Sequence, residues 1–267
     1  SALTLRIIGD FLLTTILPGM PLVIFTFSLT LAAGYGIAMG VKTIGRVGEM
    51  VFPAVIFIFF LLLILAAPDY DLANLTPIEL DFGSLVQASY SIWAFVFGDL
   101  IILSFLLPYL KSDKKEGQIR LYLLGAVLLS GIVLTLRTLS LTMAMGSQLS
   151  LIFTYPIFSM VGTIQVGDFL ERLEVIFLVM WIGSVFIKLL LCYWVAIENL
   201  DYISKVDEKQ SFLFPVGVIM VSMSQFLFES FGEEYGFVLK SWPFYSTVFV
   251  LLIPLMILSI SYLRKIF

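Results

Sequence analysis

Apolar segments of about 20 residues, separated by short polar stretches, recur along the whole of this 267-residue chain. Such a segment is long enough to cross the hydrocarbon core of a bilayer as an α-helix. Pro, Gly and clusters of charged residues bound the segments and predict helices at residues 2–17, 20–39, 51–67, 84–110, 119–146, 168–197, 212–229 and 242–263. The sequence therefore predicts an all-α, polytopic membrane helix bundle with eight transmembrane helices.

The composition excludes a soluble globular protein. Only 13% of the residues are charged and the mean hydropathy is +1.08, which leaves too little polar surface to cover a soluble domain of this length. Because the polar stretches between the segments are short, residues 1–267 are predicted to form a single transmembrane domain. There is no initiator methionine, and residues 3–16 are interpreted as the second half of a helix that begins before Ser1.

The distribution of Lys and Arg predicts the orientation of the chain, because basic residues concentrate in cytoplasmic loops. Alternate loops, at residues 41–49, 111–120, 198–211 and 263–267, carry ten basic residues, whereas the other loops carry only Lys240 and are acidic. The C-terminus is therefore predicted to be cytoplasmic. The long outer loop 68–83 is interpreted either as a connector or as a gate.

Asp99 lies in an apolar segment, where a charge is costly and usually marks a pathway or a binding site. Gly98 and Asp99 come about 12 residues before Lys111, or roughly 18 Å along a helix, which places them near the bilayer midplane. Transporters often bind substrate where a spanning helix breaks, so Phe97, Gly98 and Asp99 are predicted to form a ligand site surrounded by aromatic residues. The alternative is an unbroken helix whose Asp99 bonds a neighbouring helix.

Lys188 interrupts a second apolar segment, about 10 residues or roughly 15 Å from Glu198. Its side chain either extends to the interface or is buried. A buried ammonium would need a carboxylate or carbonyl oxygens and could occupy the place where a sodium-coupled relative holds its ion. At the start of the same helix, Asp168 and Glu171 have the spacing of a capping box, although an extracellular gate is the alternative.

The first helix carries further candidate polar residues. Arg6 and Asp10 are four residues apart and are predicted to form an ion pair. The hydroxyls of Thr14 and Thr15 either meet a substrate or bond the preceding helical turn.

Catalysis, metal binding and nucleic-acid binding are not predicted. The chain has no histidine, no glycine-rich phosphate loop and no metal-spaced Cys/His cluster, so no catalytic residue, metal ligand or cofactor is assigned. Its net charge is −4 and its basic residues flank the membrane, which argues against nucleic acid as a partner. Without histidine, any proton coupling would run through Asp10, Asp99, Glu174 or Lys188.

Several short motifs, in order, carry a resemblance to a known family. They are Leu17-Pro18-Gly19-Met20-Pro21, Gly45-Arg46 with Glu49 and Pro53, Tyr155-Pro156, the stretch from Gly167 to Glu174, Trp181 and Phe186-Ile187-Lys188. Over nearly its whole length the chain resembles the B-subunit permeases of spore nutrient-germinant receptors, a branch of the amino acid–polyamine–organocation transporter superfamily.

The resemblance implies ten helices in two inverted repeats of five, so that the eight predicted helices correspond to helices three to ten and the first two are absent. In that superfamily the broken first and sixth helices form the central site, and 84–110 would be the sixth. The third and eighth helices line the site, which makes Thr14, Thr15, Trp181 and Lys188 candidates by position.

The resemblance further implies a sensor in the inner membrane of the spore. Such a subunit binds a small nutrient, for example an amino acid, and signals to other receptor subunits to trigger germination. A proton-coupled amino acid symporter and a membrane scaffold without its own ligand remain alternatives, because sequence physics does not distinguish binding that signals from binding that transports.

Overall fold

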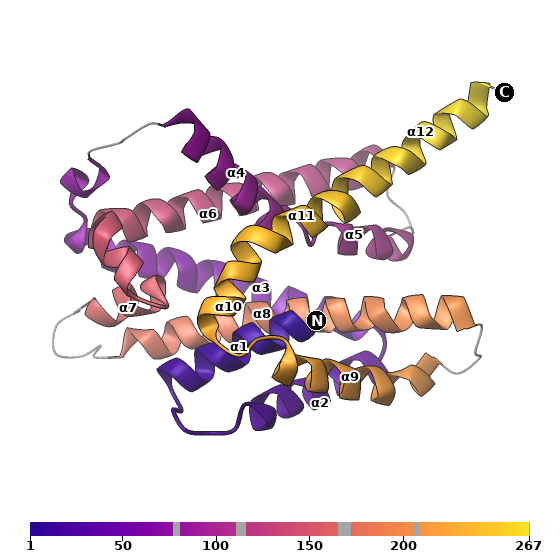
Figure 1. Cartoon of the computed structure of the whole chain (residues 1–267), viewed down its shortest axis with the longest axis horizontal. Coiled ribbons are helices and arrows are strands. Elements are labelled where there is room, and N and C mark those ends of the chain that lie inside the picture. The colour runs from indigo at the N-terminus through magenta and orange to yellow at the C-terminus, as the bar shows by residue number, and fades with distance from the viewer. Residues whose placement is uncertain (77–80, 111–115, 165–171, 205–208, 267) are drawn as a thin grey trace. The chain divides into compact units, whose positions relative to one another are not determined.

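The structure is a computed structural model that describes residues 1–76, 81–110, 116–164, 172–204 and 209–266 (Figure 1). Every regular element in these ranges is helical, which confirms the all-α prediction. Four apolar helical stretches are long enough to cross a bilayer: Val41–Asp69, Gly117–Ile152, Leu173–Ser204 and Phe231–Arg264. The protein is therefore a polytopic membrane helix bundle.

The chain divides into two compact units. Unit 1 comprises Ser1–Ile78 and Lys114–Val221, and unit 2 comprises Glu79–Asp113 and Ser222–Phe267. Each unit is thus built from two stretches that are far apart in the sequence. The prediction that residues 1–267 act as one transmembrane domain stays a prediction.

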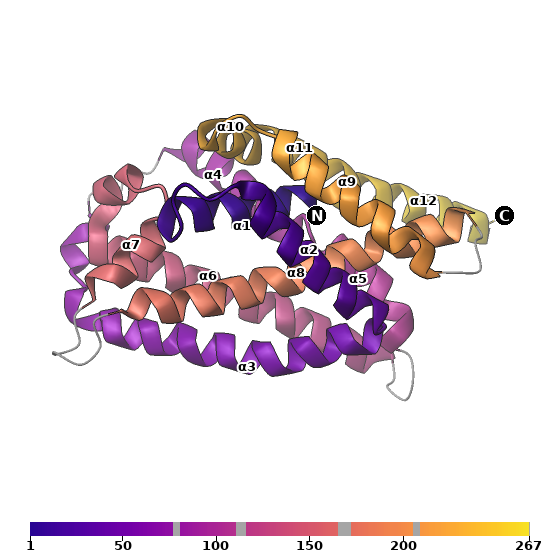
Figure 2. The ribbon, with the colours of Figure 1, turned by 90° about the horizontal axis from the view of Figure 1, so that it is seen from below.

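Unit 1 contains most of the helices. They are α1 (Ala2–Thr15), α2 (Leu22–Ala38), α3 (Val41–Ala66), α6 (Glu116–Ile152), α7 (Pro156–Thr163), α8 (Leu173–Ser204) and α9 (Leu213–Phe226), of which α9 ends in unit 2. Both views show α3 running along α8, and the two helices pack against each other (Figures 1 and 2). Short 3-10 turns at Ala67–Asp69 and Leu72–Leu75 follow α3.

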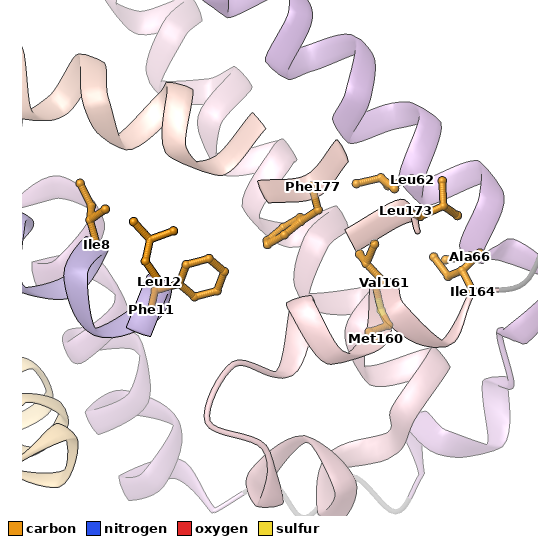
Figure 3. Close-up of a cluster of buried hydrophobic side chains, with 10 residues drawn as sticks. All are labelled: Ile8, Phe11, Leu12, Leu62, Ala66, Met160, Val161, Ile164, Leu173 and Phe177. Carbon is orange, nitrogen blue, oxygen red and sulfur yellow. The ribbon is translucent and has the colours of Figure 1, made fainter. Parts of the chain in front are cut away.

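A cluster of buried apolar side chains holds the helices of unit 1 together (Figure 3). α1, α3, α7 and α8 and the residue that follows α7 supply its members: Ile8, Phe11, Leu12, Leu62, Ala66, Met160, Val161, Ile164, Leu173 and Phe177. Because lipid tails are as apolar as these side chains, close van der Waals packing rather than escape from water stabilises such contacts in a membrane.

Unit 2 has two helical stretches, each made of several pieces. The first contains α4 (Phe82–Phe97), α5 (Ile101–Leu106) and a 3-10 turn at Leu107–Leu110. The second contains α10 (Phe231–Gly236), a π-helical segment Phe237–Ser241, α11 (Trp242–Ser246), a π-helical segment Thr247–Leu252 and α12 (Ile253–Ile266). The predicted helix 84–110 is therefore present in three pieces.

Two predicted helix starts are wrong by about ten residues. The helix predicted at 51–67 begins at Val41, directly after Gly40 with φ of 94°, and keeps Pro53 in its interior. Neighbouring helices and local adjustment satisfy the backbone group that a proline frees in a membrane helix, so Pro53 does not mark a boundary. The helix predicted at 242–263 likewise belongs to a stretch that begins at Phe231 and accepts Pro243 next to a π-helical segment.

Candidate ligand site

The helix interruption predicted at Phe97-Gly98-Asp99 is present in unit 2. α4 ends at Phe97 and α5 begins at Ile101. The N–H of Ile102 donates to the Asp99 carbonyl at 3.0 Å, and the N–H of Leu103 donates to the Leu100 carbonyl at 3.0 Å. These bonds span three residues instead of four, as in a 3-10 helix. Gly98 and Leu100 keep right-handed helical dihedrals, so the interruption is a tightened turn rather than an extended stretch.

Gly98 lets α11 approach α4 closely. A Cβ atom at this position would lie 2.5 Å from Ser246 Oγ and 3.1 Å from Ser246 Cβ, and closer still to the carbonyl oxygen of Ala94. Heavy atoms do not approach so closely without displacement, so any larger residue would push the two helices apart. Gly98 is therefore a packing requirement as well as the start of the interruption.

A cavity of about 490 Å³ opens beside this interruption. Its described lining comes from both stretches of unit 2: Gly98, Asp99, Ile101, Ile102, Phe237, Trp242, Tyr245, Ser246 and Phe249. The volume lies within the range of about 300–1,000 Å³ typical of small-molecule sites, which are apolar with a few polar groups. Asp99 is the only charged residue in the described lining.

Aromatic rings form much of the cavity wall. The ring centroid of Phe237 lies 6.5 Å from that of Trp242 and 6.3 Å from that of Tyr245. The two π-helical segments flank α11, which carries Trp242, Tyr245 and Ser246. Single π turns inside helices occur frequently at functional sites, so this local geometry is consistent with a binding role.

Hydrogen bonds link α4 to α11 and the residue that follows it, next to the cavity. The Tyr90 hydroxyl donates to the Pro243 carbonyl at 3.1 Å and lies 2.8 Å from Thr247 Oγ1. Tyr90 of α4 makes this interhelical contact, and the rings in the described lining come from residues 237–249. Phe97 ends α4, and its side chain lies outside the described part of the chain.

The predicted residues of α1 are engaged in local bonds within unit 1. Arg6 Nε donates to Asp10 Oδ2 at 2.7 Å, and only 9% and 15% of the two side chains are exposed, which confirms the predicted ion pair. Thr14 Oγ1 donates to the Asp10 carbonyl and Thr15 Oγ1 to the Phe11 carbonyl, both at 2.6 Å. These bonds favour the structural interpretation of both hydroxyls, and their role in binding a ligand stays a prediction.

Trp181 of α8 belongs to a separate aromatic cluster in unit 1. Its ring centroid lies 4.3 Å from that of Phe11, which also contacts Tyr155 and Phe158 edge-on. A small pocket of about 140 Å³ opens beside these rings. Trp181 is thus on a pocket wall in unit 1, whereas Gly98 and Asp99 line the larger cavity in unit 2.

The remaining predicted charges are half-buried in α8. Glu174 lies in the first helical turn, where a carboxylate is favoured by the helix dipole. Lys188 lies near the middle of the helix. Their roles in ion or proton coupling stay predictions, and the proposed capping residues Asp168 and Glu171 lie outside the described residues.

Comparison with known proteins places the chain among spore germination proteins. The family model described as spore germination protein matches residues 1–230. Spore germination protein KB of Bacillus subtilis (strain 168) is 24% identical over 99% of this chain and 72% of its own length. Protein YfkT of the same strain is 28% identical over 85% of this chain. Spore germination protein XB of Bacillus anthracis is 26% identical over 65% of it.

The chain spans 62% of the length of YfkT and 48% of that of protein XB. No solved structure matches the chain with significant similarity. The family match covers most of the chain and agrees with the resemblance carried by the sequence motifs. The chain belongs to the spore germination protein family.

Proposed function

We propose that this protein is the nutrient-binding membrane subunit of a spore germinant receptor. In this proposal a small nutrient, such as an amino acid, binds in the cavity beside Gly98 and Asp99. Binding signals to other receptor subunits in the inner membrane of the spore and so triggers germination. The C-terminus faces the cytoplasm, and the subunit acts by binding rather than by catalysis.

The observation that carries the proposal is the cavity itself. It combines a volume suited to a small molecule, one carboxylate, several aromatic rings and a helix interruption. The few polar groups of such a site orient the ligand, while the apolar walls supply contact area. Thr14, Thr15 and Trp181 remain proposed ligand residues on the basis of family resemblance alone.

A ligand in this cavity would contact both helical stretches of unit 2 and could therefore change how they pack. The cavity wall includes Gly98 at the interruption and Ser246 on α11, and these two residues are in close contact. A ligand shifts a conformational equilibrium only if it binds one state better than the other. We propose that the nutrient binds best when α4, α5 and α11 close around it, and that this closed state is the one the partner subunits recognise.

The first experiment measures ligand-induced stabilisation of the full-length protein in lipid nanodiscs. Amino acids, sugars and nucleosides are screened for a rise in melting temperature, since a ligand at about 100 times its Kd adds roughly 2.7 kcal/mol. We expect one class to stabilise the wild type and to lose its effect in Gly98→Leu. The matched control is Gly125→Leu, because a Cβ at Gly125 meets no heavy atom within 4 Å. Absence of stabilisation by every compound would favour a scaffold subunit.

A second experiment separates the sensor from a proton-coupled amino acid symporter. The stabilising nutrient is radiolabelled and offered to vesicles that contain the full-length protein and carry a proton gradient. The sensor hypothesis predicts binding that saturates with the amount of protein. Uptake that concentrates the nutrient and collapses with the gradient would instead establish transport.

A further inference from the structure

Arg137 is the only charged residue between Arg120 and the end of α6 at Ile152. It lies in the stretch Gly117–Ile152, which is apolar and long enough to cross a bilayer. Its side chain is exposed, and among the described residues none gives the guanidinium a hydrogen bond or an ion pair. A charge inside a membrane span is costly unless it is paired, so an anionic group at the surface of α6 would stabilise Arg137.

Arg137 is predicted to lie close to the outer headgroup region. It follows Arg120, in a predicted cytoplasmic loop, by 17 residues, or roughly 25 Å along a helix. The hydrocarbon core is about 30 Å thick, so Arg137 is within reach of its far boundary. The opposite direction gives the same level, because Met143, six residues further on, accepts hydrogen bonds from Asp71 and Asn74 of the outer loop. A long arginine side chain extends the remaining distance to the headgroups.

A small pocket of about 50 Å³ lies beside Arg137. Residues of α3, α6, α7 and α8 line it, and apart from Arg137 and Ser140 the described lining is apolar. Ser140 is already engaged, because its Oγ lies 2.5 Å from the Tyr70 hydroxyl. The volume is far below the range of about 300–1,000 Å³ typical of small-molecule sites. The pocket therefore combines one cation with apolar side chains and is too small for a whole nutrient.

Part of the apolar lining belongs to the packed interior of unit 1. Leu62, Met160, Val161 and Phe177 line the pocket and are also members of the buried cluster (Figure 3). They come from α3, α7 and α8. An apolar chain that lies in this recess would therefore gain close contact with firmly packed side chains, and such van der Waals contact is what stabilises association within a membrane.

We propose that Arg137 binds the phosphate of an anionic phospholipid, and that an acyl chain of this lipid lies against the pocket. The guanidinium presents parallel N–H donors that match the oxygen atoms of a phosphate. The described lining contains no Asp or Glu, so nothing in it would hold the ammonium group of a zwitterionic headgroup. Charge complementarity therefore favours a lipid with a net negative charge, such as phosphatidylglycerol. This inference is independent of the proposed nutrient site, which lies in unit 2.

The test measures lipid binding to the full-length protein purified in maltoside detergent. Dioleoylphosphatidylglycerol and dioleoylphosphatidylcholine are titrated separately, bound lipids are counted by native mass spectrometry, and the melting temperature is recorded. We expect the tightest site to bind phosphatidylglycerol at least about tenfold more strongly than phosphatidylcholine, as fits a charge-assisted hydrogen bond. Inorganic phosphate at the same concentration should leave the melting temperature unchanged. If inorganic phosphate stabilises the protein as much as phosphatidylglycerol does, the site binds a free anion and the proposal is overturned.

Arg137→Gln keeps a polar side chain but removes the charge. It should weaken the tightest phosphatidylglycerol site by about tenfold. Arg137→Lys should retain part of the affinity, because it keeps the charge but loses the parallel donors. The matched control is Arg120→Gln at the other end of α6, which should leave that site unchanged. Wild-type affinity in Arg137→Gln, or an equal loss in Arg120→Gln, would overturn the proposal.

A second measurement distinguishes the lipid from a carboxylate of the protein itself. If Arg137 binds lipid, Arg137→Gln should lower the melting temperature in phosphatidylglycerol nanodiscs and leave it nearly unchanged in phosphatidylcholine nanodiscs. A loss of equal size in both membranes would assign the guanidinium to an intramolecular ion pair and overturn the lipid site.

Discussion

Helix α6 of unit 1 and the α4–α5 stretch of unit 2 are both interrupted, and the surroundings of the two interruptions differ. In unit 1, α6 contains Gly146 with φ of 73° and ψ of 164°. Just before it, the Met143 carbonyl accepts hydrogen bonds from the Asp71 N–H at 3.1 Å and from Asn74 Nδ2 at 2.8 Å. The loop after α3 therefore supplies hydrogen bonds to the Met143 carbonyl, close to the point where the regular bonding of α6 ends.

The loop that supplies these bonds is anchored a second time. The Tyr70 hydroxyl donates to the Leu63 carbonyl at 2.9 Å and lies 2.5 Å from Ser140 Oγ. Tyr70, Asp71 and Asn74 of the loop 68–83 are thus hydrogen-bonded to α3 and α6. These contacts favour the connector interpretation of the loop over the gate.

In unit 2 the interruption between α4 and α5 borders a cavity instead. Asp99 and Ser246 are both among the residues that line it. Since polar groups within a bilayer need internal partners, the comparison teaches that an interruption whose carbonyl groups are bonded by a neighbouring loop is structural, whereas an interruption that borders a cavity is a candidate binding site.

The largest expected effect follows from Gly98→Leu. The new side chain would collide with Ser246 and with the Ala94 carbonyl, so we expect a loss of about 3 kcal/mol of stability from overpacking, together with loss of ligand binding. Denaturant unfolding of the full-length protein in detergent measures the first quantity. Unchanged stability would show that α4 and α11 are not in close contact, whereas Gly125→Leu should have little effect.

Gly146→Val tests the structural interruption. Backbone with this φ and ψ is essentially restricted to glycine, and other residues there cost about 1–3 kcal/mol. We expect a destabilisation of about 2 kcal/mol without a change in the ligand preference of the cavity in unit 2. A variant that retains full stability but loses ligand binding would contradict the division into a structural and a binding interruption.

Asn74→Ala removes one of the two bonds to Met143. The expected loss is about 1 kcal/mol, because the Asp71 N–H remains as a donor to the same carbonyl. Hydrogen exchange should accelerate for the amides of residues 70–76. Thr76→Ala provides the matched control, since its hydroxyl donates within the loop, to the Ala73 carbonyl.

The smallest expected effect concerns Asp81 at the start of α4. The Ser84 N–H and hydroxyl donate to its carboxylate, both at 2.8 Å, and lower the pKa of Asp81 below its usual value of 3.8. A lowered pKa in the folded state stabilises the helix start above the unfolded pKa, and this stabilisation is lost as pH falls through the folded pKa. Amide exchange at residues 84–86 should therefore rise in acid, and Asp81→Asn should abolish that pH dependence.

Local sequence signals predicted the class of fold and one half of the candidate site. Gly98 and Asp99 stood out because a glycine and a carboxylate are both unfavourable in the middle of an apolar helix. The other half was missed, since it depends on pairing α4 with α11: Tyr90 and Pro243, which bond across this contact, are 153 residues apart. The sequence does show a cluster of aromatic residues at Trp242, Phe244, Tyr245 and Phe249. Aromatic residues are also common on surfaces that face lipid, so the cluster alone does not indicate a cavity.

The predicted helix boundaries were wrong where a proline lies inside a membrane helix, as Pro53 does in α3. The helix predicted to start at residue 51 already begins at Val41, and Pro53 lies in its interior. The short helix α7 between Pro156 and Thr163 was not predicted at all, because eight residues are too few to show a helical period. In both cases tertiary packing decides the local conformation.

The π-helical segments on either side of α11 fix how the last helix is rotated. Each π turn accommodates one residue more than an α turn, and each residue of an α-helix turns the chain by roughly 100°. If the residues of Thr247–Leu252 formed an ordinary α-helix instead, the extra residue would rotate α12 by about that angle relative to α11. The π-helical geometry of this segment therefore determines the directions in which the side chains of α12 point.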